Sequence, residues 1–428
     1  MKILWVKAGK LLPVDTGGKI RSYNILRQLT SGHEVTVLTF YRGQRDAEYE
    51  SEVERHFPGA MTFHEFASDF HTAGRVVDYV RHLVSPAPYV VAKFRSPQVQ
   101  RVLASAGDGR FDVAVCDFAD AAVNFPLVPV IPTVLFQHNV ESELWRRQAD
   151  VESKWARKIV FQLEAAKMRR YETGVLRRLD CVIAVSENDR GLMGQVIDRS
   201  RITVVPTGVD LQLYRPMMGR QASEPLVVFT GSMDWEANID AVEYFCREIW
   251  PLVRAVVPEA RFRIVGRAPQ GRVRKLACDS VEVTGTVPSV VSHLAEATVV
   301  VVPLRIGGGT RLKIYEAMAT GRAVVSTSVG AEGLDVHHGK DIWLADTPRR
   351  FADGITMLIR DPVLRQTYEN AAAQLAAQYD WPAIAERFLR VLDQVTTTSA
   401  IRGGQRALAS EEVARKGLKA GKTRGRRQ

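Results

Sequence analysis

Short apolar runs alternate with longer segments of helical periodicity along the first half of the chain. The apolar runs predict strands at 2–6, 34–40, 112–116, 131–137 and 180–185. The segments between them repeat apolar residues with helical spacing, which predicts helices at 17–31, 43–56, 71–84, 96–106, 141–179 and 187–196. Strands that alternate with helices in this way are typical of a parallel sheet covered by helices on both faces.

The same alternation begins again after a proline-rich segment at 206–225. Strands are predicted at 226–230, 261–265, 281–284, 298–302, 323–326 and 342–344, and helices at 237–257, 269–278, 289–296, 311–320, 348–359 and 361–379. We therefore expect an α/β protein with two doubly wound, Rossmann-like domains, at 1–205 and 226–380, followed by a helix at 381–395. Ligands of such sheets bind beyond the carboxyl ends of the strands, so the expected site is the cleft between the two domains.

Charge is concentrated at the end of the chain. The 428 residues carry a net charge of +10, and the segment from Arg402 to Gln428 holds nine Lys or Arg residues against two Glu. Large apolar side chains are scarce there, so the tail at 396–428 is predicted to be disordered. It would either contact nucleic acid or anionic lipid, or only increase solubility. No recognised nucleic-acid-binding module accompanies it, so a specific nucleic-acid partner is not expected.

Composition also bears on the compartment and on metals. The four cysteines form no Cys-x-x-Cys pair, no apolar run of about 18 residues occurs, and the chain opens directly into a strand rather than a signal peptide. These features predict a cytoplasmic protein with reduced cysteines. No cluster of His and Cys suggests a metal site, so we expect neither a metal nor a cofactor.

The most informative segment is 303–321, where an apolar strand, a glycine-rich loop and a short helix follow one another. Backbone N–H groups of such a loop can approach an anion closely, and the helix N-terminus favours negative charge. The candidate binding residues are Gly308, Gly309, Thr310, Arg311, Lys313 and Glu316. The two cations suit a diphosphate, and the carboxylate can accept hydrogen bonds from ribose hydroxyls. The alternative is an ordinary glycine turn before a solvated helix that carries a Lys313–Glu316 pair.

Three further candidates stand at the carboxyl ends of predicted strands. Gly17 and Gly18 precede a helix, where close backbone approach and the helix dipole favour an anion. His138 can donate or accept a hydrogen bond near neutral pH. Gly231 and Ser232 follow the first strand of the second domain. A plain turn or a structural histidine remains the alternative for each.

The segment from Glu143 to Arg178 is long, helical and basic, with interspersed aromatic residues. Cations and interfacial aromatics together are typical of a helix on an anionic membrane surface. Its basic residues include Arg146, Arg147, Lys154, Lys158 and Arg170. The alternative is a helix packed on the sheet with a solvated basic face.

Together these residues resemble the glycosyltransferase family 4 enzymes of the two-domain GT-B fold, in which two Rossmann-like domains face a central cleft. The resemblance covers nearly all of 1–395, and its most specific parts are 303–321 and 324–334. It is closest to the sugar transferases associated with bacterial exopolysaccharide and exosortase gene clusters. It implies metal-independent, retaining transfer of a sugar from a nucleotide-sugar, with the donor on the second domain and the acceptor on the first.

The resemblance also assigns roles to individual residues. It implies that Glu316 binds ribose, that Gly17 and Gly18 lie near the diphosphate, and that His138 lies near the donor sugar. Thr310 and its neighbours would contact the diphosphate or sugar through their backbone.

Two departures from the family pattern change the expected chemistry. Gly308 stands where many members have a glutamate that contacts the donor sugar, and the loop at Gly231 lacks the usual Arg and Lys. Stabilisation of the departing diphosphate therefore falls to Arg311 and Lys313, with Arg305 as a further candidate.

The leading hypothesis is a sugar transferase acting on a glycan or lipid-linked acceptor, in the cytoplasm or on the inner face of the cell membrane. The alternatives are a nucleotide-sugar epimerase of the same fold and a basic nucleic-acid-binding protein.

Overall fold

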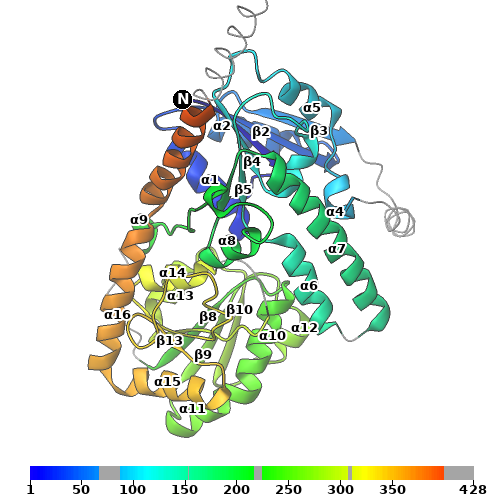
Figure 1. Cartoon of the computed structure of the whole chain (residues 1–428). Coiled ribbons are helices and arrows are strands. Elements are labelled where there is room, and N and C mark those ends of the chain that lie inside the picture. Colours follow the sequence, from blue (N-terminus) through cyan, green and yellow to red (C-terminus); the bar gives the residue numbers. More distant parts are fainter. Residues whose placement is uncertain (67–86, 153, 216–223, 307–310, 400–428) are drawn as a thin grey trace, which may run out of the picture.

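A computed structural model of the chain describes residues 1–66, 87–152, 154–215, 224–306 and 311–399. Two parallel β-sheets, each covered by helices, lie one above the other in Figure 1. The predicted α/β class with two Rossmann-like domains is confirmed. The glycine loop at 307–310, the helix expected at 71–84 and the tail at 400–428 lie outside the described residues.

The first sheet has seven parallel strands in the order β3-β2-β1-β4-β5-β6-β7. They are β1 (Lys2–Ala8), β2 (Glu34–Gly43), β3 (Met61–Phe66), β4 (Val113–Asp117), β5 (Thr133–Gln137), β6 (Cys181–Ala184) and β7 (Ile202–Val204). The sequence analysis missed β3 and β7, the two edge strands. β3 mixes polar with apolar residues and β7 has only three residues, so neither forms the long apolar run of a central strand.

Helices cover both faces of this sheet. They are α1 (Gly17–Leu29), α2 (Ala47–His56), α4 (Tyr89–Ala92), α5 (Pro97–Ala104), α6 (Glu141–Val151), α7 (Trp155–Arg178) and α8 (Glu187–Met193). The single helix expected at 141–179 is wrong. Glu152 and Lys154 have extended backbone, so the chain turns there and α6 packs against α7 as a helical hairpin (Figure 1).

The second sheet has six parallel strands in the order β10-β9-β8-β11-β12-β13. They are β8 (Leu226–Thr230), β9 (Arg261–Val265), β10 (Val281–Gly285), β11 (Val299–Val302), β12 (Ala323–Ser326) and β13 (Trp343–Leu344). Its helices are α10 (Glu236–Tyr244), α11 (Trp250–Val256), α12 (Gly271–Arg274), α13 (Val291–Glu296), α14 (Leu312–Ala319), α15 (Pro348–Arg360) and α16 (Pro362–Ala376), and a π-helical turn at Phe245–Ile249 joins α10 to α11. The helix expected at 269–278 is reduced to the single turn of α12.

The last helix ties the two halves together. It covers 381–399, continuing beyond the expected end near 395. Figure 1 shows it running from the second sheet back to the first. There Phe388 packs on Trp5 and Phe136, with ring centroids 5.5 and 5.1 Å apart. No helix within the described residues is both long and apolar enough to cross a membrane.

Candidate functional site

The candidate site is a cleft between the two sheets. Strand order reverses between β1 and β4 in the first sheet and between β8 and β11 in the second, and ligands of doubly wound folds bind at such reversals. The loops that follow these strands line a cavity of about 960 Å³. Among the predicted site residues, those that line it are Gly17, Gly18, Gly231, Ser232, Arg311, Lys313 and Glu316.

The N-terminus of α1 forms the first-domain wall of the cleft. A Cβ atom on Gly18 would lie 2.9 Å from Cε2 of Phe118, so no side chain fits there. A Cβ atom on Gly17 would lie 3.6 Å from Cδ1 of Leu312, at the start of α14 on the opposite wall. The first two residues of this 13-residue helix have no side chains, so its N-terminal backbone faces the cleft. The helix dipole there favours an anion.

Lys313 lies on α14, across the cleft from α1. Its Nζ atom donates a hydrogen bond to Oδ1 of Asn238 at 3.1 Å and lies 4.2 Å from the ring centre of Phe229. Burial, together with the charge of Arg311, lowers the pKa of Lys313 to about 7, and Glu316 opposes the change. A dianionic ligand in the cleft would reverse this effect, because it would stabilise the protonated amine.

Arg311 precedes α14 and is largely buried. Burial lowers its pKa to about 10, against the attraction of Glu332. Two cations whose charged forms are both disfavoured lie within one short segment, which suits an anionic ligand. Gly308, Gly309 and Thr310, predicted to contact the same ligand, lie outside the described residues.

Glu316 is held by a residue from the segment between the two domains. The hydroxyl of Tyr214, at the end of α9 (Leu211–Tyr214), makes a hydrogen bond with the Glu316 carboxylate. Burial raises the pKa of Glu316, while Tyr214 and Lys313 act in the opposite direction. The carboxylate lines the cleft three positions beyond Lys313, where it can accept hydrogen bonds from a ligand.

The loop after β8 receives a cation that the sequence analysis missed. Arg267, which follows β9, donates from Nε to Oγ of Ser232 at 2.8 Å. Its Nη1 atom lies 3.1 Å from Oδ2 of Asp15 on the first domain. The two loops meet closely because Gly266 has no side chain, since a Cβ atom there would overlap the carbonyl oxygen of Gly231. Arg267 therefore brings a guanidinium group, paired with Asp15, to the lining of the cleft.

Arg305, the further candidate for charge stabilisation, does not line the cleft. Its Nη2 atom lies 2.6 Å from Oδ1 of Asp240, and its guanidinium stacks 4.3 Å above the ring of Tyr244.

His138 lies behind the first-domain wall rather than in the cleft. The side chain is fully buried and stacks on Phe118 with ring centroids 4.0 Å apart. Its Nε2 atom lies 2.9 Å from Oδ1 of Asp117. Burial lowers the pKa of His138 to about 4, against the attraction of Asp117, so the ring is neutral near pH 7. Its Nδ1 atom would lie 3.7 Å from a Cβ atom on Gly18. A role beside the donor sugar stays a prediction.

Asp120 is a cleft residue that the sequence analysis did not single out. Burial raises its pKa to about 6, while Lys93 and Lys7 act against the rise. Asp120 shortly follows β4, next to the point where the strand order reverses. Its position after a predicted strand was the signal that could have identified it.

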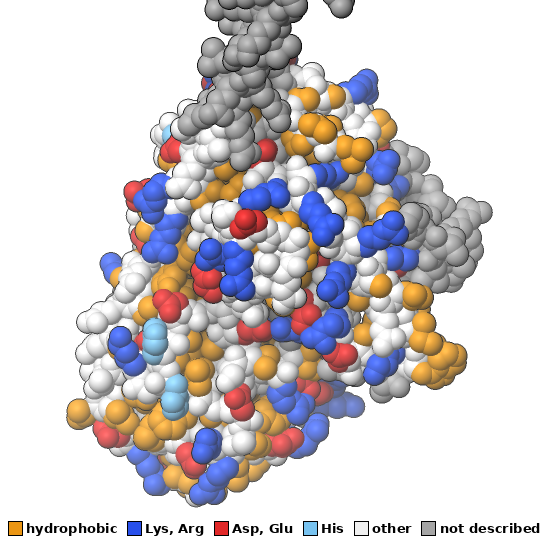
Figure 2. Space-filling view, in the orientation of Figure 1, with side chains coloured by type: hydrophobic (Ala, Val, Ile, Leu, Met, Phe, Trp, Pro, Cys, Tyr) orange, Lys and Arg blue, Asp and Glu red, His pale blue; other side chains and the backbone are white. Residues whose placement is uncertain are grey.

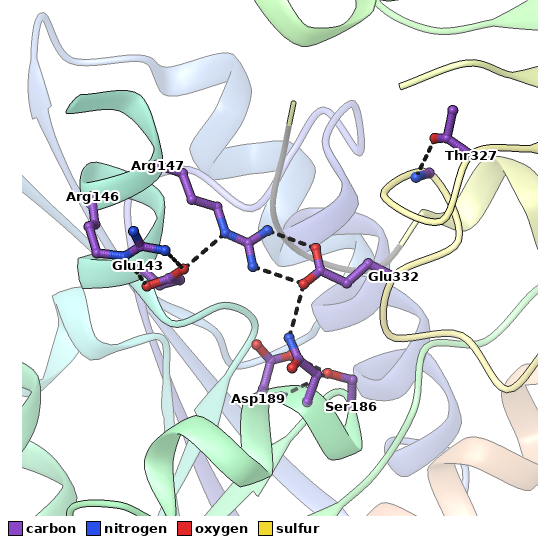
Figure 3. Close-up of polar contacts among 9 residues, drawn as sticks. Glu143, Arg146, Arg147, Ser186, Asp189, Thr327 and Glu332 are labelled. Carbon is purple, nitrogen blue, oxygen red and sulfur yellow. Dashed lines mark hydrogen bonds and ion pairs between the residues drawn. The ribbon is translucent and has the colours of Figure 1, made fainter. Parts of the chain in front are cut away.

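An ion pair joins the two domains beside the cleft (Figure 3). The guanidinium of Arg147 on α6 binds both carboxylate oxygens of Glu332, at 2.7 and 2.8 Å. Asn188 donates to the same carboxylate at 3.1 Å, and Glu143 accepts from Arg147 at 3.0 Å.

The membrane contact predicted for this basic segment stays a prediction, but two of its arginines have protein partners. Arg147 is engaged with the second domain, and Arg146 pairs with Glu143 and Asp150.

Within the described part of the chain, no group of three or more His, Cys, Asp or Glu residues is arranged to hold a metal ion. Metal independence stays a prediction.

Comparison with known proteins gives two family matches. Residues 17–213 match "Glycosyltransferase Family 4", and residues 224–361 match "Glycosyl transferases group 1". A phosphatidyl-myo-inositol mannosyltransferase of Mycobacterium leprae is 29% identical over 35% of this chain and 42% of its own length. An uncharacterized 44.6 kDa protein in the cps region of Klebsiella pneumoniae is 20% identical over 89% of this chain and 96% of its own. A D-inositol 3-phosphate glycosyltransferase of Catenulispora acidiphila is 28% identical over 55% of this chain. The chain thus spans 42% of the mannosyltransferase and 60% of the inositol phosphate enzyme.

Solved structures of the same architecture cover nearly the whole chain. Anabaena Alr3699/HepE in complex with UDP and glucose has a TM-score of 0.62 and 18% identity, over 92% of this chain and 99% of that protein. Sucrose-phosphate synthase from Thermosynechococcus elongatus has a TM-score of 0.66 and 17% identity, over 93% and 100%. At these identities the likeness shows the fold.

Proposed function

The chain belongs to the glycosyltransferases with a family 4 N-terminal domain and a group 1 C-terminal domain, and we propose that it transfers a sugar from a nucleotide-sugar to a glycan or lipid-linked acceptor. The observation that carries the proposal is the cleft at both strand-order reversals. It places the glycine-containing N-terminus of α1 opposite two cations at the start of α14, Arg311 and Lys313. Two cations and a helix dipole directed at one volume suit a diphosphate. Glu316, held by Tyr214, suits the ribose of the same ligand.

In the proposed reaction the sugar leaves the nucleotide with retention of configuration and without a metal. Negative charge grows on the diphosphate as the glycosidic bond breaks, and preorganised cations stabilise that charge. Arg311 and Lys313 would provide this stabilisation, with Arg267 near the edge of the cleft. The acceptor hydroxyl attacks from the face that the diphosphate leaves, and a leaving-group oxygen takes its proton. Asp120 would hold the acceptor by accepting a hydrogen bond from a second hydroxyl, because the attacking hydroxyl gives its one proton to the leaving group.

A nucleotide panel and a product assay test this function. A nucleoside diphosphate that binds only the folded protein increases the free energy of unfolding, by about 2.7 kcal/mol at a hundredfold excess over Kd. This stabilisation is measured as a rise in the melting temperature. The donor identified in this way is then incubated with candidate acceptors, and the anomeric configuration of the product is read by NMR. Inversion would contradict the retaining mechanism. Isomerisation of free donor without acceptor would favour the epimerase alternative instead.

The acceptor is proposed to reside on the cytoplasmic membrane surface, in exopolysaccharide or other envelope glycan synthesis. The support is an exposed apolar stripe on α7, formed by Trp155, Ile159 and Leu163, which are 76, 47 and 48% exposed. Figure 2 shows hydrophobic side chains gathered at the end of the α6–α7 hairpin. Lys154 and Lys158 flank this stripe, as expected for a helix at an anionic interface.

Vesicle binding tests the placement. The stripe variant Trp155→Ser/Ile159→Ser should lose sedimentation with anionic vesicles. Charge reversal at Arg147 should have less effect on vesicle binding, because that side chain is engaged with Glu332. A truncation after residue 399 serves as the control for the basic tail. If only the truncation loses binding, the tail is the membrane contact and the assignment to α7 is wrong.

A further inference from the structure

A second cavity lies in the first domain, outside the cleft. It measures about 620 Å³ and lies between α6, α7 and α8, above the end of β5. Its walls are mainly apolar and include Leu135, Val175, Leu176, Leu192 and Met193. The volume lies within the usual range for small-molecule sites. We call this cavity the α6–α7 pocket.

Polar groups at the base of the pocket are already paired with one another. The carboxylate of Glu172 accepts hydrogen bonds from the backbone N–H groups of Glu141 and Ser142, at 2.7 and 3.1 Å. Gln137 donates to Glu172 and to the Asn139 carbonyl, and its own oxygen accepts from the Ala119 N–H. The polar groups at the bottom of the pocket therefore have few hydrogen-bonding positions left for a ligand. An apolar ligand could bind there without breaking the hydrogen bonds that these groups already make.

The rim of the pocket is cationic. Arg169 and Arg170, on α7, line it and are exposed. Within the described residues, neither side chain makes a hydrogen bond or ion pair with a protein group, whereas Arg146 on the same rim is paired with acidic neighbours. Two available guanidinium groups beside an apolar cavity complement a ligand with a hydrocarbon chain and an anionic head.

The pocket and the cleft lie on opposite sides of the start of α6. A small hollow between them shares Val140 and Glu143 with the pocket, and Asn139 and Leu144 with the cleft. A ligand seated in the pocket would therefore lie next to the proposed reaction site. The exposed stripe of Trp155, Ile159 and Leu163 lies on the same helix, N-terminal to the pocket residues Ala165 and Ala166.

We propose that the α6–α7 pocket binds the hydrocarbon chain of a phosphate-bearing lipid, with Arg169 and Arg170 pairing its phosphate. Resting on the proposed function, this lipid is the carrier of the acceptor. The pocket would withdraw the start of the chain from the membrane and present the attached head group beside the cleft.

Titration calorimetry on the full-length protein tests the pocket with decyl phosphate below its micelle concentration. Decyltrimethylammonium supplies the same chain with a cationic head, and inorganic phosphate supplies the head alone. We expect decyl phosphate to bind with at least about tenfold higher affinity than either control. Equal binding of the cationic amphiphile, saturation by phosphate alone, or no binding of decyl phosphate would overturn the proposal.

Two variants locate the binding. Ala165→Phe should fill the pocket and abolish binding, and Arg169→Glu/Arg170→Glu should weaken decyl phosphate by about tenfold or more. Arg177→Glu is the matched control, because this exposed arginine on α7 does not line the pocket. Each variant must retain the thermal shift with nucleoside diphosphate. Wild-type affinity in both folded pocket variants overturns the assignment.

The two proposals fail separately. Decyl phosphate binding with the expected variant pattern, but no transfer from any nucleotide-sugar, would keep the pocket and refute the proposed function. Transfer to a soluble acceptor without any binding of decyl phosphate would support the proposed function and refute the lipid-binding role of the pocket.

Discussion

Lys313 should couple donor binding to the uptake of a proton. Burial beside Arg311 lowers its pKa to about 7, so at about pH 8 roughly nine tenths of the free protein carries a neutral amine there. A bound diphosphate stabilises the ammonium form and restores a pKa near the ordinary lysine value of about 10.4. Donor binding at about pH 8 should then take up about 0.9 proton, and affinity should fall about tenfold for each pH unit above 7.

Calorimetry in two buffers of different ionisation enthalpy measures this uptake directly. A nucleotide-sugar is the suitable ligand because its diphosphate is a diester and does not titrate in this range. Lys313→Met should bind more weakly, take up no proton through this site, and lose the added pH dependence. Absence of uptake in the wild type, or the same pH slope in the variant, would refute the reasoning.

The free protein should show the opposite pH dependence. Because the folded chain holds the Lys313 proton less tightly than the unfolded chain, the unfolded state binds more protons between pH 7 and about 10.4. Lys313 therefore makes the free energy of unfolding rise with pH over this window. The difference in denaturant midpoint between the wild type and Lys313→Met isolates that contribution.

Three further predictions concern the same cleft. Glu316→Ala should lower kcat/KM for the donor by roughly 10- to 150-fold, the equivalent of about 1.5–3 kcal/mol for a lost charge-assisted hydrogen bond; an unchanged donor titration in the folded variant would count against a ribose role. Transfer should persist after metal removal and in excess EDTA, and a complete loss that magnesium or manganese restores would show a metal requirement. Ionised Asp120 accepts a stronger hydrogen bond than the protonated acid, so transfer should rise with pH through about 6, where its raised pKa lies, and Asp120→Asn should flatten that rise; an identical profile in the variant would remove Asp120 from the mechanism.

Local pattern was sufficient to predict the fold class and several residues on both walls of the candidate site. Central strands of a parallel sheet are buried on both faces, so runs such as 299–302 stand out as continuous valine. Local pattern also predicted Gly17, Gly18, Lys313 and Glu316, because a glycine turn directly before a helix indicates an anion-binding site and involves only residues adjacent in the sequence. The edge strands β3 and β7 were missed because edge strands lack the continuous apolar run.

Contacts between distant residues were decided only by the tertiary structure. Arg267 reaches Ser232 and Asp15 because β8 and β9 are neighbours and because Gly266 allows their loops to approach. Tyr214 meets Glu316 because the segment between the domains returns past α14.

The turn between α6 and α7 was also decided only by the tertiary structure. It brings Arg147 to Glu332 instead of leaving that charge on a membrane face, and it lets α6 and α7 enclose a pocket. The periodicity of 141–179 suits one long helix as well as two, so it could not predict this turn. The sequence by itself determined the central strands and most of the helices, while side-chain pairing between distant residues decided what each charge does. A charge acts on whatever lies within a few ångströms, and for most of these residues those neighbours are more than a hundred positions away in the chain.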